Sequence, residues 1–207
     1  MVMAVGLLLA GCGGSSDAPA TATSHSPTGS ASPTAQVLEL GKSELTLDAG
    51  AVRSPDGFAP ALELEVPAGW TSTHRYADAF DVGQADPKAD APLVVVAVTT
   101  APEPDADAAL TAVADRQRGA DLTRESGDLL GSPAHTLEVV GGDGPAYSSR
   151  DGSIALDAVP GYRLRLLATD VAGTALVVAV LVVDDGRTDD LLSQAEALVG
   201  SLHATET

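Results

Sequence analysis

Short apolar runs in the first half of the chain predict β-strands. Within residues 62–66, leucine and valine alternate with glutamate, which is typical of a half-buried strand, and the Pro-Ala-Gly-Trp segment at 67–70 ends it. Residues 93–98 form a continuous run of leucine, valine and alanine, so we expect both faces of that strand to be covered. The polar residues 78–92 between them predict an irregular loop.

The second half of the chain continues the strand pattern. Leucines 129–130, a Gly-Ser-Pro turn at 131–133 and the run 136–140 predict a hairpin, and the glycine-rich residues 141–145 predict a second turn. After it, Tyr162, Leu164, Leu166 and Ala168 alternate with arginines. Residues 170–173 then turn the chain, and 175–183 return as the most apolar strand.

The segment 105–119 predicts a helix between two of these strands. Asp105 is a good N-cap, and Asp107 suits the first turn. Arg116 and Arg118 suit the last turn, and Gly119 provides the stop. We expect the apolar face of this helix to consist of Ala106, Leu110, Val113 and Ala114.

A second helix is predicted at the end of the chain, opened by Asp189 and Asp190. Its apolar residues recur at helical spacing and form one stripe, so we expect this face to pack on the sheet. The stripe consists of Leu191, Leu192, Ala195, Leu198, Val199 and Leu202. Together the elements predict an α+β fold, a mostly antiparallel sheet covered by two helices, in a single domain at 43–207.

Composition separates this domain from the residues before it. Residues 12–42 are rich in Ser, Thr, Ala and Pro with few apolar residues, so we expect a disordered tether. Its roughly 30 flexible residues would span about 30 Å root-mean-square, enough to hold the domain clear of a surface.

The chain begins with an apolar stretch that ends in Leu9-Ala10-Gly11-Cys12. This order is a lipobox, which predicts a signal peptide at 1–11, cleavage between Gly11 and Cys12, and lipidation of Cys12. Two or three acyl chains, such as palmitate, would then anchor the protein to the extracytoplasmic face of the cell membrane. No Lys or Arg precedes Cys12, whereas signal peptides open with a positive segment, so we expect the true start upstream.

The formal charge of −18 repels phosphate, so we expect no nucleic-acid partner. Cys12 is the only cysteine, which excludes an intrachain disulfide. The apolar run 175–183 has nine residues, well short of the roughly 20 that a membrane-spanning helix needs.

This layout resembles a known family. The strand that ends at 67–70, the central helix, the Gly-Ser-Pro-Ala turn at 131–134, the two long strands and the C-terminal helix look like a PsbP-like domain. Behind a lipobox and a tether, the arrangement is similar to the LpqN/LpqT lipoproteins of actinobacteria. The resemblance implies an α/β/α sandwich that serves as a non-catalytic binding or accessory module.

The sequence contains no motif that indicates catalysis. The four histidines, His25, His74, His135 and His203, are scattered without the spacing of a zinc site. No Gly-x-Ser-x-Gly elbow or phosphate loop is present, so we name no catalytic residue, no metal ligand and no cofactor, and the ligand-binding residues stay unknown.

Two acidic clusters could supply oxygen ligands to calcium, but their spacing is not that of an EF-hand, and a solvated acidic loop and the first turn of a helix are the favoured interpretation. They are Asp78, Asp81, Asp86 and Asp90, and Asp184, Asp185, Asp189 and Asp190.

We therefore expect a monomeric, membrane-anchored cell-envelope lipoprotein that binds a lipid, a peptide or a partner protein. The alternatives are an envelope hydrolase of an unrecognised family and a calcium-dependent interaction domain. An apolar pocket favours the binding module. Paired carboxylates or a Ser–His pair in a cleft favour the hydrolase.

Overall fold

The computed structural model describes residues 34–86, 91–141, 145–148, 155–157 and 161–205. The predicted signal peptide, Cys12, the tether up to residue 33, His25 and Asp90 lie outside the described residues. The chain divides into two units, residues 1–32 and residues 33–207, and the helices and strands described below belong to the second unit.

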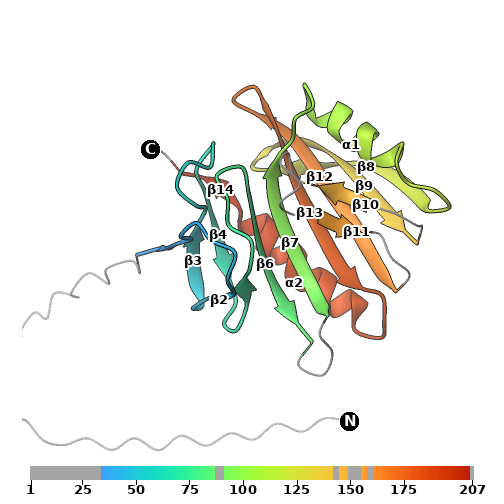
Figure 1. Cartoon of the computed structure of the whole chain (residues 1–207). Coiled ribbons are helices and arrows are strands. Elements are labelled where there is room, and N and C mark those ends of the chain that lie inside the picture. Colours follow the sequence, from blue (N-terminus) through green and yellow to red (C-terminus); the bar gives the residue numbers. More distant parts are fainter. Residues whose placement is uncertain (1–33, 87–90, 142–144, 149–154, 158–160, 206–207) are drawn as a thin grey trace, which may run out of the picture. The chain divides into compact units, whose positions relative to one another are not determined.

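An eight-stranded antiparallel sheet forms the centre of the fold (Figure 1). Its strand order is β2-β5-β6-β7-β13-β12-β9-β8, so that every neighbouring pair is antiparallel. In chain order these strands are β2 (Leu45–Thr46), β5 (Thr71–Ser72), β6 (Ala79–Ala85), β7 (Pro92–Thr100), β8 (Asp121–Leu129), β9 (Ser132–Val140), β12 (Tyr162–Val171) and β13 (Thr174–Val183).

Two smaller sheets accompany the central one. The first has the order β1-β3-β4-β14, with β1 parallel to β3. Its strands are β1 (Gln36–Val37), β3 (Gly50–Arg53), β4 (Leu62–Val66) and β14 (His203–Ala204). The second is the hairpin of β10 (Pro145–Ser148) and β11 (Ala155–Asp157).

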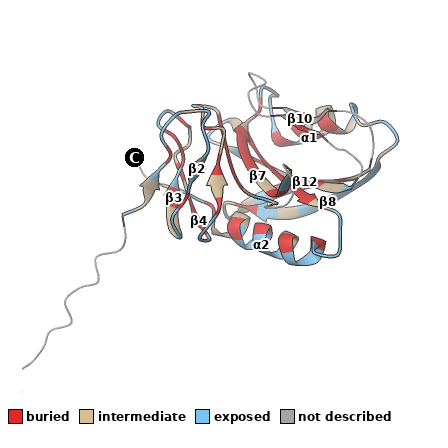
Figure 2. Ribbon diagram, turned by 60° about the horizontal axis from the view of Figure 1, so that its bottom comes forward, coloured by how far each residue is buried: buried red, intermediate tan, exposed pale blue. Residues whose placement is uncertain are grey.

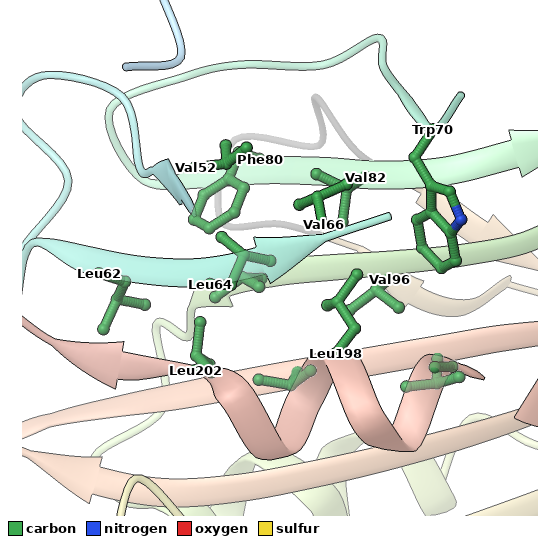
Figure 3. Packing of buried hydrophobic residues seen from close by; sticks show 14 of the residues in the cluster. Val52, Leu62, Leu64, Val66, Trp70, Phe80, Val82, Val96, Leu198 and Leu202 are labelled. Carbon is green, nitrogen blue, oxygen red and sulfur yellow. The ribbon is translucent and has the colours of Figure 1, made fainter. Parts of the chain in front are cut away.

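Two helices, α1 (Ala106–Ala114) and α2 (Thr188–Ser201), cover opposite faces of the sheet. Strand β13 shows this directly: Leu176, Val178, Val180 and Val182 belong to the core on the α2 side, and Ala175, Val177, Ala179 and Leu181 to the core on the α1 side. Figure 3 shows Leu198 and Leu202 on the side of α2 that faces Leu64 and Val96. The predicted α+β fold is confirmed.

The N-terminal boundary of the folded body differs from the prediction. We expected the tether to run to residue 42, but β1 pairs with β3 and the Leu38 side chain is fully buried in the core. The Gly41 amide and carbonyl also bond to the backbone of Arg75. Residues 36–41 therefore belong to the folded body.

The loop predicted at 78–92 is wrong for most of its length, because residues 79–85 form strand β6 between β5 and β7. Its polar and glycine residues interrupt the apolar pattern, so the sequence did not predict a strand here. Asp81 is buried but satisfied by local hydrogen bonds, and Gly83 is needed because a Cβ there would lie 2.5 Å from the Val94 carbonyl oxygen.

Helix α1 begins as predicted, with the Asp105 carboxylate accepting a hydrogen bond from the Ala108 amide at 2.8 Å. It ends at Ala114, however, so that Arg116 and Arg118 follow the helix instead of closing its last turn. Its fully buried residues include Ala109, and Ala114 is only partly buried.

The β8–β9 turn is shorter than the predicted one. Leu129 pairs with Ser132, so Leu130 and Gly131 form a two-residue turn, both with positive φ, as a type I′ turn requires. Ser132 and Pro133 already belong to β9. Of the second predicted turn, residues 142–144 lie outside the described residues.

Candidate functional site

A groove of about 410 Å³ runs between α2 and the part of the sheet formed by β8, β9 and β12. Its volume lies within the range of roughly 300–1,000 Å³ that is typical of ligand pockets. Helix α2 packs on β4, β7 and β13. Figure 2 shows α2 below β8 and β12, with a buried side toward the sheet and an exposed side away from it.

The lining of this groove is mostly apolar. Strands contribute Leu129, Leu167 and Val180, the β8–β9 turn contributes Leu130, and α2 and its C-cap contribute Leu192, Val199 and Leu202. Four of these side chains are only partly buried, namely Leu130, Leu167, Leu192 and Val199. Small residues, among them Gly127, Thr136 and Gly200, also line it, and the charged lining residues are Asp128, Arg165 and Glu196.

An ion pair connects the two walls of the groove. The Arg165 guanidinium, on β12, donates to the Glu196 carboxylate, on α2, and their side chains are 31% and 53% exposed. A smaller hollow of about 40 Å³ shares Arg165, Val180 and Leu192 with the main groove. Because three lining residues are shared, the two hollows are parts of one groove along α2, which we call the α2 groove.

His74 and Asp81 form the arrangement closest to a catalytic site. The imidazole Nδ1 lies 2.7 Å from the Asp81 Oδ2 atom, as in an acid–base pair. The Ser72 hydroxyl donates to Asp81 Oδ1 at 3.5 Å, and so to the carboxylate instead of the imidazole, and Ser72 is buried. In the described part of the chain no hydroxyl bonds to the imidazole. Asp81 also accepts hydrogen bonds from the amides of Thr73 and His74, so the pair fixes the β5–β6 connection.

Three acids of these clusters pair with arginines. Asp86 and Asp185 both face Arg187, at 3.5 and 2.7 Å, and Asp184 pairs with Arg163. The hydrogen bond from Arg187 lowers the pKa of the Asp185 carboxyl below its ordinary value, and the same bond raises the pKa of Arg187.

The remaining acids of the second cluster, Asp189 and Asp190, lie in the first turn of α2. There their negative charges interact favourably with the positive end of the helix dipole. Among the described residues, no three His, Cys, Asp or Glu side chains are placed to hold a metal ion.

No helix in the described part of the chain has the length and the apolar character that a membrane span requires. His135 and His203 are exposed.

Comparison with known proteins gives distant structural similarities only. No family model matches the chain, and no curated protein matches it. Similar solved structures include the cyanobacterial PsbP of Synechocystis sp. PCC 6803, with 16% identity over 77% of this chain and 95% of that one and a TM-score of 0.48. LpqN of Mycobacterium tuberculosis, described as involved in cell envelope biogenesis, has 16% identity over 79% and 91% and a TM-score of 0.33.

A Bacteroides thetaiotaomicron VPI-5482 protein has 12% identity over 77% of this chain and a TM-score of 0.44, and this chain spans half of its length. A PsbP and LpqN are thus among the similar structures, as the sequence resemblance suggested. Similarities this distant assign neither a family nor a function, and membership of the LpqN/LpqT type stays a prediction.

Proposed function

We propose that this protein is a non-catalytic binding module of the cell envelope, anchored through acyl chains on Cys12, and that it holds an apolar ligand in the α2 groove. The observation that carries the proposal is the partly buried apolar lining of that groove. Leu130, Leu167, Leu192 and Val199 expose apolar surface inside a hollow of about 410 Å³, which a ligand would remove from water.

The geometry favours binding over hydrolysis. Hydrolases need a nucleophile or an activated water together with a group that orients it. The acid–base pair in the described residues, His74–Asp81, bonds to no hydroxyl through its imidazole. The walls of the α2 groove are mostly hydrophobic, and Arg165 and Arg163 in its lining are already bonded to Glu196 and Asp184.

The test uses the full chain with Cys12→Ala, which removes the lipidation site, and the neutral apolar probe N-phenyl-1-naphthylamine. Two further variants place a tryptophan on α2: Val199→Trp fills the groove, and Gln194→Trp adds the same side chain at an exposed position outside its lining. Matched thermal unfolding curves establish that both variants fold.

We expect saturable one-site fluorescence enhancement in the parent and in Gln194→Trp, with binding at least about tenfold weaker in Val199→Trp. This corresponds to about 1.4 kcal/mol, which is close to the lower end of the roughly 1.5–3 kcal/mol gained by burying one apolar side chain. Equal binding in all three proteins would refute the groove as the site. Turnover of ester, peptide or glycoside substrates that disappears on substituting His74 or Asp81 would favour the hydrolase.

A further inference from the structure

The α2 groove is chemically asymmetric along its length. Strand β12 points Arg163, Arg165 and Leu167 to the same side of the sheet, since alternate residues share a face. At the Leu167 end the groove is mostly apolar, with Leu129, Leu130 and Val199 around it and the exposed Asp128 beside them. At the other end the smaller hollow is lined by Arg163, Arg165 and Glu138. An occupant lying along α2 therefore meets an apolar half and a charged half.

The charged half contains one carboxylate without a partner. Glu138 lies directly opposite Arg165 in the β9–β12 register, where side chains are neighbours. The Arg165 guanidinium nevertheless bonds to Glu196, and Arg163 bonds to Asp184. Glu138 has no hydrogen bond or ion pair among the described residues, although it is only partly exposed and lines the hollow beside Val180 and Leu192.

The charges that line this half of the groove favour a ligand with a positively charged head group. With both guanidiniums already paired, the unpaired Glu138 leaves the charged half negative. An anionic head would need to displace Glu196 from Arg165 and would lie close to Glu138. A cationic head completes the pairing of Glu138 without breaking any existing bond. The formal charge of −18 for the whole chain acts in the same direction.

We propose that the α2 groove selects a cationic amphiphile, with the apolar tail between Leu167 and Val199 and an ammonium or guanidinium head at Glu138, which is the specificity-determining residue. This inference rests on the proposed function, because it needs the groove to be the binding site. Beyond that function, it specifies the charge of the head group and the residue that recognises this charge.

The test compares three probes with one tail and different heads at pH 7: dodecylamine and dodecanoate below their micelle concentrations, and dodecanol below its solubility limit. Each probe displaces N-phenyl-1-naphthylamine from the Cys12→Ala chain. We expect dodecylamine to bind about three- to fivefold more tightly than dodecanol, as one partly exposed ion pair allows, and dodecanoate to bind more weakly than dodecanol. The difference should shrink with added salt.

Glu138→Gln should make dodecylamine and dodecanol bind equally while leaving dodecanol unchanged. Glu39→Gln, the same change at an exposed position outside the groove lining, should preserve the order of the three probes. Glu196→Gln frees Arg165 and should improve dodecanoate binding. Dodecanoate binding as tightly as dodecylamine to the parent would overturn the inference while keeping the groove, and displacement by none of the probes would overturn the proposed function itself.

Discussion

Arg75 is expected to fasten the N-terminal segment to the sheet, and replacing it tests this directly. The residue is 5% exposed, and no carboxylate lies within ion-pair distance in the described residues. Its guanidinium donates instead to three main-chain carbonyls: Nε to Glu39 at 2.7 Å, and Nη1 to Ser43 at 2.9 Å and to Ser72 at 2.6 Å. These acceptors belong to segments far apart in the sequence.

Arg75→Met keeps the apolar stem and removes all three donors. Hydrogen bonds to a charged group are worth about 1.5–3 kcal/mol each, but two of the carbonyls lie in an exposed segment where water can replace the donor. The Ser72 carbonyl belongs to a buried residue and keeps the full desolvation cost of about 1–3 kcal/mol. We therefore expect the free energy of unfolding to fall by about 3 kcal/mol.

Urea unfolding at constant m-value measures this change. Arg53→Met is the matched control, because Arg53 is 46% exposed and its one ion-pair partner among the described residues is Glu63, so its loss should cost less than about 1 kcal/mol. If Arg75→Met lowers the free energy of unfolding no more than Arg53→Met does, water replaces the hydrogen bonds to the three carbonyls. Arg75 then does not hold the N-terminal segment on the sheet.

Gly41 supplies an independent check on the same contact. A Cβ at Gly41 would lie 2.9 Å from Arg75 Nη2, so Gly41→Ala must displace the guanidinium. We expect Gly41→Ala to destabilise the parent by about 1 kcal/mol or more, and to be neutral or stabilising by up to about 1 kcal/mol in an Arg75→Ala background. Equal effects in both backgrounds would show that the two residues are not coupled.

Three further predictions concern the anchor, the N-terminal boundary and the C-terminal helix. Cys12→Ala should release the protein from the membrane fraction, and sedimentation with membranes would contradict the lipoprotein prediction. Removing residues 1–33 should leave cooperative thermal unfolding unchanged. Removing residues 1–42 also deletes the fully buried Leu38 and should lower the free energy of unfolding by about 2–5 kcal/mol or more. Equal stability of the two truncated proteins would place Leu38 outside the core. Leu198→Asp puts a charge at a position 3% exposed and should cost several kcal/mol in urea unfolding, and an unchanged midpoint would mean that this side of α2 is not packed.

The sequence predicts those elements whose burial is uniform. In β13 every position from Ala175 to Val182 is buried, so the apolar run is continuous and unambiguous. Helix α2 buries one side only, and its stripe appears at helical spacing. For these elements the hydrophobic pattern alone determines which surface faces the core.

The elements that the sequence misses have polar residues for local reasons. In β6, Asp81 is buried because amides and an imidazole surround its carboxylate, a pairing that only the fold brings together. In β8, Leu129 alone is buried because the strand lies at the sheet edge, so no alternation appears. Leu38 is the buried residue of a short apolar run whose other members, Val37 and Leu40, are exposed, and this run is too short to separate the folded body from the tether.

The α2 groove follows from the way α2 is held, which no periodicity in the sequence reveals. At its N-terminus the Thr188 hydroxyl bonds to the Val183 carbonyl at the end of β13. At its C-terminus the chain continues into β14, which pairs with β4. Both attachments lie on the β13 and β4 side, so α2 covers that side. The surface formed by Leu167 of β12, Thr136 of β9 and the end of β8 keeps a hollow. Because its position depends on these two attachments, loosening β14 from β4 should alter ligand binding in the groove as well as stability.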